Sequence, residues 1–216
     1  MFAGGVGRYF LNSIIVSGVS VALVLALGSL AGYGFAKLNF RFNKSLFVVF
    51  LMGAMIPVHV TLIPLFVLSL RLGIYDSLFA LIGPYVGFNL PVAIFILTEF
   101  FRQIPGEIEE AARLDGASRW AIFSRIALPL SMPALVTVGI FSLIFIWNEF
   151  VFALVLISDP SNRTLPLGLT QFYQQFSIDV PGVMAALTLA TLPIVLLYVF
   201  AQERVISGLM AGAVKG

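Results

Sequence analysis

The chain has 216 residues, of which 60% are hydrophobic and only 10% are charged. Soluble domains carry roughly 25% charged residues, so this composition excludes an ordinary soluble domain and indicates a membrane protein. The net charge of +2 requires no nucleic-acid partner. The distribution of Lys and Arg between the two sides of the membrane, described below, accounts for the basic residues. The sequence contains no cysteine, which excludes disulfide bonds and thiolate metal sites.

Five uncharged runs separate the clusters of charged residues. Each run exceeds the roughly 20 residues that a helix needs to cross the hydrocarbon core of a bilayer. The sequence therefore predicts an all-α, polytopic membrane protein with a single transmembrane domain over residues 1–216. Five spans are expected, at about 9–36, 45–70, 77–98, 130–157 and 181–202.

The Lys and Arg residues predict the orientation, because cationic loops tend to stay on the cytoplasmic side. If the first linker is cytoplasmic, three cations lie outside, namely Arg8, Arg71 and Arg163. The other nine lie inside, namely Lys37, Arg41, Lys44, Arg102, Arg113, Arg119, Arg125, Arg204 and Lys215. This distribution predicts an outside N-terminus, a cytoplasmic C-terminus and a cytoplasmic loop over residues 103–129, which we call the coupling loop.

Small residues and prolines mark the first two spans. Gly28 and Gly32 have the small-xxx-small spacing that lets two helix backbones approach closely. Pro57 and Pro64 each remove a backbone donor, so the second span should be bent or locally unwound. His59 is the only histidine, and a metal site needs three or more ligands, so no metal site is expected.

The coupling loop begins with the features of a short helix. Pro105 fits the first helical position, where its missing N–H costs least. Glu107 and Glu109 place negative charge in the first turn, where the helix dipole favours it. The glycine of Asp115-Gly116 is the usual stop signal of a helix. We expect a helix of about two turns.

This short helix has two distinct faces, and a second helical stretch follows it. Helical spacing places Ile104, Ile108, Ala111 and Ala112 on one face. Glu109 and Arg113 can pair at i and i+4 on another face. Ser118 can cap the second stretch, whose apolar residues Ile122, Phe123 and Ile126 precede Pro129 and Pro133.

The composition of the first helix suits docking into the groove of another protein. Two consecutive alanines, Ala111 and Ala112, let a groove approach the backbone, while an exposed Glu110 gives a directional charged contact. The alternative is an amphipathic loop that lies on the membrane surface. Such helices are usually rich in Lys and Arg with bulky apolar faces, and this acidic, alanine-rich stretch fits that description poorly.

The coupling loop resembles the EAA loop of the membrane subunits of bacterial ABC importers. The resemblance rests on Glu110, Ala111, Ala112, Asp115, Gly116, Ile126 and Pro129. Over nearly all of its length the chain is similar to the carbohydrate-type, maltose-permease-like class. The matching stretches are Asn12-Ser13, Tyr33 to Phe40, Ile56-Pro57, Ile63-Pro64, Trp147 to Phe150, Thr164 to Leu169 and Gly208 to Gly216.

The resemblance implies a binding-protein-dependent importer in a bacterial inner membrane, in which this chain is a non-catalytic permease. Its EAA residues would dock on ABC ATPase subunits, which hold the ATP and Mg. A second, homologous permease and an extracytoplasmic sugar-binding protein would complete the assembly within the membrane lipid. In agreement, the sequence has no G-x-x-x-x-G-K-[ST] phosphate loop. The family core has six spans, and this chain begins just before what would be the second.

Two polar residues in the fourth span are candidates for the translocation path. A charge at the centre of a membrane helix costs at least ~2.5 kcal/mol on insertion scales, so Glu149 should face a cavity or a partner. We expect Asn148 and Glu149 beside the path. The alternative is a structural hydrogen bond, or an ion pair between permease subunits. Family members often carry Asp at the position of Glu149, which keeps the charge.

Other functions fit the sequence less well. An importer of glycerol phosphate or another polyol has the same architecture but needs cationic groups near the path, and the predicted spans contain none. An ion-driven secondary transporter would show internal repeats and matched broken helices. An intramembrane enzyme would need a converging nucleophile and base or a metal cluster, which one histidine and no cysteine do not supply.

Overall fold

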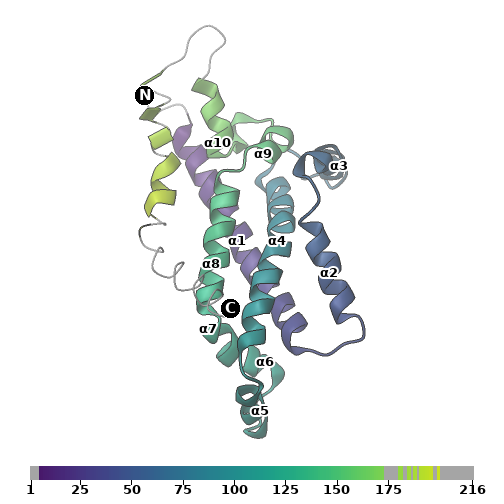
Figure 1. Cartoon of the computed structure of the whole chain (residues 1–216). Helices are drawn as coiled ribbons and strands as arrows, with labels where there is room; N and C mark the ends of the chain where they lie inside the picture. Colours follow the sequence, from purple (N-terminus) through teal and green to yellow (C-terminus); the bar gives the residue numbers. More distant parts are fainter. Residues whose placement is uncertain are drawn as a thin grey trace. The chain divides into compact units, whose positions relative to one another are not determined.

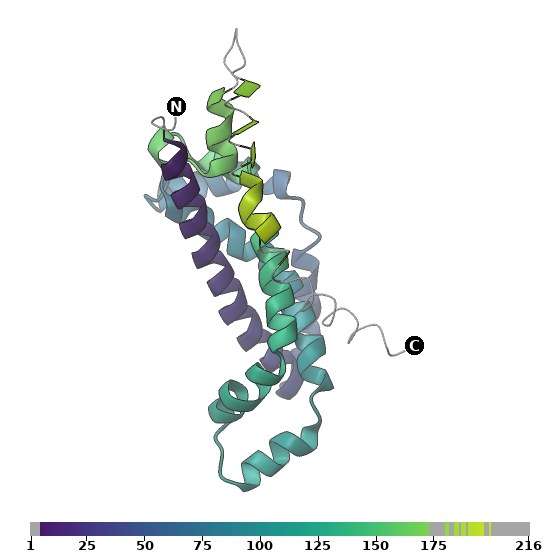
Figure 2. The same ribbon diagram turned by 90° about the vertical axis from the view of Figure 1, so that its left-hand side faces the viewer.

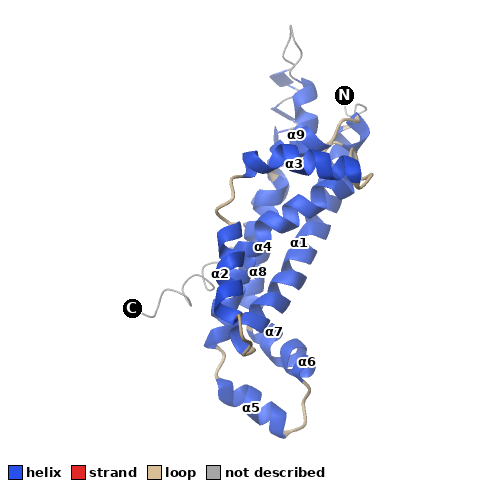
Figure 3. Cartoon of the chain, turned by 90° about the vertical axis from the view of Figure 1, so that its right-hand side faces the viewer, coloured by secondary structure: helices blue, strands red, loops and turns tan. Residues whose placement is uncertain are grey.

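The computed structural model describes residues 5–172, 180–181, 184–185, 187–188, 190–196 and 199. These residues form helices, turns and loops without any strand (Figure 3), which confirms the all-α prediction. The predicted fifth span lies partly outside this set, and Gly208 to Gly216 lies wholly outside it. The helices (Figure 1) are α1 Val6–Lys37, α2 Asn43–Gly53, α3 Val58–Arg71, α4 Leu78–Gln103, α5 Gly106–Leu114, α6 Arg119–Ile122, π-helix η1 Phe123–Ala127, α7 Leu128–Leu130, α8 Met132–Trp147, α9 Val151–Leu156, 3-10 helix η2 Pro160–Asn162, α10 Leu165–Gly168 and 3-10 helix η3 Leu169–Phe172.

Two of the described helices, α1 and α4, are individually long and apolar enough to cross a membrane. The number rises to four if α2 with α3, and the segment Arg119–Leu130 with α8, each form one broken span. Helix α4 runs to Gln103, past the predicted span end at residue 98. No proline or glycine lies between residue 98 and Pro105, and Glu99 pairs with Arg102 at 2.6 Å in the last turns.

Proline acts differently at two places in the second predicted span. The helix breaks before Pro57, which has extended backbone angles (φ −65°, ψ 130°) as the N-cap of α3. Pro64 lies inside α3 without ending it. The expected interruption is therefore confirmed at Pro57, whereas α3 continues through Pro64.

The fourth predicted span, at 130–157, is not one continuous helix. It is interrupted at Ser131, where the helix direction changes by 73°, and again at residues 148–150, between α8 and α9. Pro133 lacks a backbone N–H, which explains why the helix cannot run straight through the first interruption. Asn148 and Glu149 consequently lie between two helices rather than deep inside one.

The chain divides into two compact units, which we describe separately. Unit 1 comprises Met1–Val21, Pro57–Gly87 and Ser142–Phe200, and unit 2 comprises Ala22–Ile56, Phe88–Phe141 and Ala201–Gly216. Helices α1, α4 and α8 contribute residues to both units. The described cations also divide: Arg8, Arg71 and Arg163 belong to unit 1, and those predicted to be cytoplasmic, from Lys37 to Arg125, belong to unit 2.

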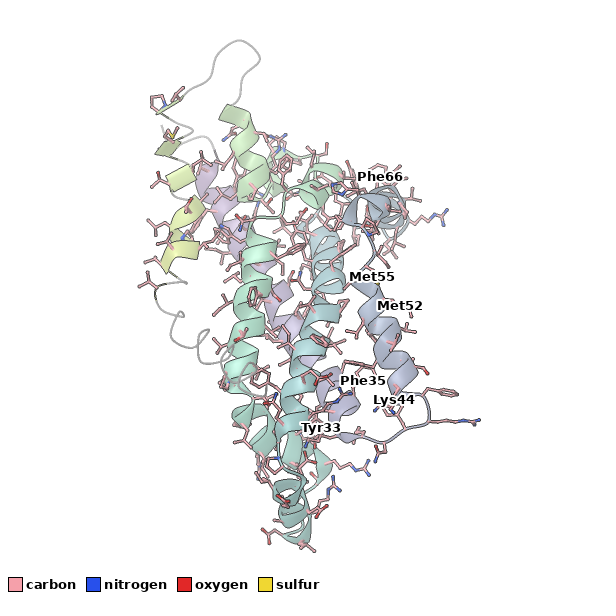
Figure 4. The ribbon with its side chains drawn as sticks, in the orientation of Figure 1. Tyr33, Phe35, Lys44, Met52, Met55 and Phe66 are labelled. Carbon is pink, nitrogen blue, oxygen red and sulfur yellow. The ribbon has the colours of Figure 1, made fainter. Side chains whose placement is uncertain are left out.

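In unit 2, glycines bring α1 and α4 into close contact. A Cβ atom at Gly28 would lie 3.2 Å from the Cβ atom of Ala93, and one at Gly32 would lie 3.1 Å from that of Leu97. The small-xxx-small spacing, which permits close approach of another helix, thus coincides with a close contact here. The next residue, Tyr33 (labelled in Figure 4), packs edge-on against the ring of Phe101, with a centroid distance of 5.5 Å.

In unit 1, the beginning of α1 is hydrogen-bonded to the segment after α9. The Asn12 side-chain amide donates to the carbonyls of Ser161 and Arg163, both at 2.9 Å. The Ser13 hydroxyl accepts from the Leu165 N–H at 2.8 Å. Tyr9 fills the space beside Gly168, where a Cβ atom would collide with its ring. Two stretches that carry the family resemblance, far apart in sequence, therefore pack directly on each other.

Asp76 ties the turn before α4 to the segment that follows α9. Its carboxylate accepts hydrogen bonds from the N–H groups of Ser158 and Asp159. Its own N–H donates to the Leu156 carbonyl at 3.0 Å, and its carbonyl accepts from the Asn162 side chain at 2.6 Å. The φ angle of Asp76 is 59°, a left-handed conformation that Asp tolerates better than most residues.

Candidate coupling site and polar residues of the spans

Helix α5 forms where the sequence predicts the first helix of the coupling loop, with one difference at its start. Pro105 is the N-cap rather than the first helical residue, and its ψ of 136° is extended. A shift of one position is common at helix ends, and the missing N–H of proline is harmless at either position. Glu107 and Glu109 lie in the first turn, where the helix dipole stabilises negative charge.

The C-terminus of α5 is closed by a Schellman motif. Gly116 has a φ of 83°, and its N–H donates to the Arg113 carbonyl at 3.0 Å, while the Ala117 N–H donates to the Ala112 carbonyl at 2.9 Å. This pair of bonds satisfies carbonyls that the helix end would otherwise leave free. The predicted stop at Asp115-Gly116 is thus confirmed, and a side chain at Gly116 would strain the backbone.

The second helical stretch begins at the predicted cap. The Ser118 hydroxyl accepts a hydrogen bond from the Ala121 N–H at 3.2 Å, which confirms its role at the start of α6. Ile122 and Phe123 are buried and Ile126 is half-buried, as an inward-facing apolar stripe requires. From Phe123 to Ala127 the helix widens into η1, and Pro129 in α7 is exposed.

The exposed surface of the coupling loop combines small, acidic and bulky apolar groups. Figure 2 shows this loop, in teal, as successive short helices joined by a turn. Glu110, Ala111, Asp115 and Gly116 are exposed and Ala112 is half-buried. Leu114 is 90% exposed and Trp120 is 64% exposed. Sequence reasoning did not predict that Leu114 and Trp120 are exposed. For Leu114 a signal was available, because helical spacing places it off the predicted apolar face, between the charged residues Arg113 and Asp115.

The side of α5 that packs against unit 2 is not its apolar face. Within α5 the one buried residue is Glu109, whereas Ile108 is 40% exposed. Glu109 Oε2 lies 3.4 Å from the Arg113 guanidinium, which confirms the predicted i, i+4 pair. Its other oxygen, Oε1, lies 3.5 Å from Nζ of Lys37, a partner that sequence reasoning missed because Lys37 ends a different helix.

The two polar residues of the fourth predicted span have different environments. Glu149 is buried, accepts hydrogen bonds from the Tyr85 hydroxyl at 2.8 Å and the Phe152 N–H at 2.9 Å, and so covers the N-terminus of α9. Asn148 is exposed, and its amide donates to the Ile144 carbonyl at 2.7 Å. The geometry of Glu149 resembles the structural alternative more than a group that faces a path.

An apolar cavity of about 300 Å³ lies in unit 1, beside α1 and α8. Its lining includes Phe10, Ile14, Leu143, Ile144, Trp147 and Ile194. The Ser17 hydroxyl is the main polar group in the lining of the cavity. A sugar needs several hydrogen-bonding groups, so this cavity does not have the lining of a sugar site.

Helical spans joined to a short exposed helix on a polar loop are the features of a transport permease, and the chain belongs to the family of binding-protein-dependent transport system inner membrane components. The profile of that family matches residues 24–210. The protein is thus a multi-pass inner-membrane component of a binding-protein-dependent ABC importer.

Named relatives place the chain among ABC transporter permeases. It is 51% identical over 213 residues to a putative ABC transporter permease, ORF2, of Caldicellulosiruptor sp. (strain Rt8B.4), covering 99% of this chain and 78% of the relative. It is 36% identical to the trehalose/maltose transport system permease MalG of Thermococcus litoralis, covering 96% of this chain and 75% of the relative.

Solved structures share the fold. A chain of a bacterial ABC transporter involved in the import of the acidic polysaccharide alginate superimposes with a TM-score of 0.81 at 22% identity, covering 94% of this chain and 76% of that chain. A chain of the inward-facing MetNI methionine ABC transporter superimposes with a TM-score of 0.71 at 17% identity, covering 92% of this chain and 93% of that chain.

Proposed function

We propose that this chain forms half of the translocation path of a sugar importer and transmits the work of a separate ATPase through its coupling loop. The sugar assignment is supported by relatives whose names specify trehalose or maltose, trehalose, and melibiose, raffinose or stachyose. In this proposal the chain performs no catalysis, and ATP and Mg are bound by the partner ATPase.

The observation that carries the proposal is the exposed surface of α5. A short helix whose apolar side chains point outward gains stability by inserting them into a groove of another protein. Leu114, at 90% exposure, is the most exposed apolar side chain on α5. Ala111 permits close approach of the partner, Glu110 supplies a charged contact, and the Schellman turn at Gly116 fixes the end of the helix. The proposed docking residues are therefore Glu110, Ala111, Ala112, Asp115 and Gly116, with Ile126 and Pro129 supporting them.

We further propose five spans, with the coupling loop and the C-terminus in the cytoplasm. The separation of cations between the two units supports this orientation, because cationic segments favour the cytoplasmic side. Unit 2 contains both the coupling loop and the described cations predicted to be cytoplasmic. The loops predicted to be extracytoplasmic would then face a binding protein, and a second permease would complete the path.

Within the path we propose Asn148 as the exposed polar contact and Glu149 as the neighbouring carboxylate that holds the break between α8 and α9. The carboxylate fixes Phe152 and Ala153 through their N–H groups. A sugar is bound through hydrogen bonds from fixed polar groups, so an exposed amide at a rigid helix break is a suitable contact.

The coupling proposal is tested with the substitutions Glu110→Lys and Gly116→Val, followed by copurification of the ATPase with the tagged chain in mild detergent. The first reverses the charge of an exposed residue, and the second forces a side chain into a φ of 83°. We expect both variants to remain in the membrane and to lose the ATPase and sugar uptake.

Gly106→Ala is the matched control. Gly106 lies in the same loop without a left-handed φ, and a Cβ atom there would meet nothing within 4 Å. This control should keep both the ATPase and uptake. Undiminished uptake in both Glu110→Lys and Gly116→Val would refute the docking role of α5.

A further inference from the structure

The attachment of α5 to the rest of unit 2 is unusual, because the side chain that it buries is a carboxylate. Surface helices usually pack through an apolar stripe. On α5 the apolar side chains of Ile108 and Leu114 are instead exposed, at 40% and 90%, while the Glu109 side chain is 5% exposed. Apolar burial therefore contributes little to the position of α5, and polar contacts must set it.

Lys37 supplies the charge that compensates this carboxylate. It is the last residue of α1, and its side chain is 12% exposed. Its Nζ lies 3.5 Å from Glu109 Oε1, an oxygen that accepts no hydrogen bond among the described residues. A buried carboxylate is costly unless it is paired. Arg113, which faces the other carboxylate oxygen, is half exposed, so Lys37 is the buried counter-charge.

The same ammonium group also holds the backbone that leads into α5. Lys37 Nζ donates a 2.6 Å hydrogen bond to the carbonyl of Ile104, the residue before the N-cap Pro105. The two contacts lie on either side of the start of α5. The Ile104 carbonyl precedes the helix, and Glu109 lies within its first turn. With a single contact, α5 could rotate about Pro105. Two contacts to the Lys37 ammonium group define the direction of α5 relative to the end of α1.

We propose that Lys37 is a positioning residue for the coupling helix: its ammonium holds Glu109 and the Ile104 carbonyl together, and so fixes α5 against the end of α1. This inference rests on the proposed coupling function. Movement imposed on α5 by the ATPase is passed to α1 through this contact, in addition to the covalent connection at residues 104–105.

The position of α5 can be measured directly, since the chain has no native cysteine. Cysteines introduced at Val48 on α2 and Leu114 on α5, both exposed, take one spin label each. Their separation is then measured by pulsed electron resonance on the full-length purified chain. The parent is expected to give one narrow distance distribution. Lys37→Met is expected to lose this narrow peak, while the exposed control Lys44→Met keeps it.

A double variant separates positioning from folding stability. Removing one partner of a buried ion pair leaves an uncompensated charge, whereas removing both does not. We therefore expect Lys37→Met with Glu109→Gln to unfold at nearly the parent temperature and still to lack the narrow peak. If Lys37→Met alone does not accumulate in the membrane, this double variant decides the question. A narrow peak in the double variant, at the parent distance, overturns the proposal.

The measurement also distinguishes this inference from the coupling proposal. Failure of the ATPase to copurify with the parent chain would contradict docking, and the distance distribution of the isolated chain would still test the role of Lys37. Conversely, an ATPase that copurifies with the parent, together with a narrow peak in Lys37→Met, would keep the docking proposal and overturn the positioning role.

Discussion

The hydroxyl of Tyr85 on α4 donates a 2.8 Å hydrogen bond to Oε2 of Glu149, and both side chains are buried in unit 1. The same carboxylate accepts from backbone N–H groups at the start of α9. A buried acceptor of this kind is stabilised by its donors and destabilised by the loss of any of them. The contact therefore joins α4 to the break between α8 and α9.

Replacing Tyr85 by Phe should destabilise the protein without changing the volume of the core appreciably. Hydrogen bonds to charged groups contribute about 1.5–3 kcal/mol, and we expect a loss of that size. The measurement is the thermal unfolding of the purified chain in detergent. Tyr75→Phe is the control, since Tyr75 is half-buried and its ring contact with Phe66 survives the change. An equal loss of stability in both variants would contradict a specific role for the Tyr85 hydroxyl.

Gly32→Ala should destabilise the contact between α1 and α4. The new Cβ atom would lie 3.1 Å from Cβ of Leu97 and 3.2 Å from the Thr98 nitrogen, and overpacking of this kind costs about 1–3 kcal/mol. Gly34→Ala on the same helix should leave stability unchanged or slightly higher, because a Cβ atom there meets nothing within 4 Å and alanine favours helix. Thermal unfolding of the two variants gives the comparison, and a Gly34→Ala variant as unstable as Gly32→Ala would argue against close packing at Gly32.

Asp76→Ala should loosen the segment after α9 and lower stability by about 1–3 kcal/mol, since it removes carboxylate hydrogen bonds and places alanine in a left-handed conformation. Asp76→Asn should cost less, because asparagine tolerates that conformation and keeps one acceptor oxygen. Amide hydrogen exchange at Ser158 and Asp159 reports the effect directly. Unchanged exchange in Asp76→Ala would show that these bonds do not order the segment.

Asp159 should make the order of η2 depend on pH in the acidic range. The Ser161 backbone N–H donates to the carboxylate at 2.7 Å and lowers the pKa of Asp159 below its usual value. A lowered pKa means that the contribution is present above the unfolded pKa of about 3.9 and is lost as the pH falls through the folded pKa. Amide exchange at Ser161, corrected for the intrinsic rate, should accelerate across that window. Asp159→Asn should remove this acceleration, and its persistence in the variant would exclude Asp159 as its cause.

Local signals in the sequence predict much of the coupling loop. The stop at Gly116, the cap at Ser118 and the pairing of Glu109 with Arg113 all depend on residues within four positions of one another, and each is confirmed. The spacing of Gly28 and Gly32 is also a local signal, because it permits a groove on one helix. The sequence did not indicate which helix packs into that groove.

The contacts that sequence reasoning missed join residues far apart in the chain. Lys37 pairs with Glu109, and Asn12 donates a hydrogen bond to the Ser161 carbonyl. The local sequence pattern around Lys37 or Asn12 does not identify these partners. The break between α8 and α9 was also missed, because residues 130–157 are apolar enough to read as one continuous span. The carboxylate of Glu149, which looked like an isolated charge in a helix, is instead satisfied by the helix end that this break creates.

The hydrogen bonds from Asn12 constrain the order in which the chain can mature. Its amide belongs to α1, yet both of its carbonyl acceptors, on Ser161 and Arg163, are synthesised about 150 residues later. Until then a polar group in an apolar helix has no permanent partner, which is costly in lipid. The N-terminal turns of α1 therefore reach their final packing only after residues 161–163 have been translated.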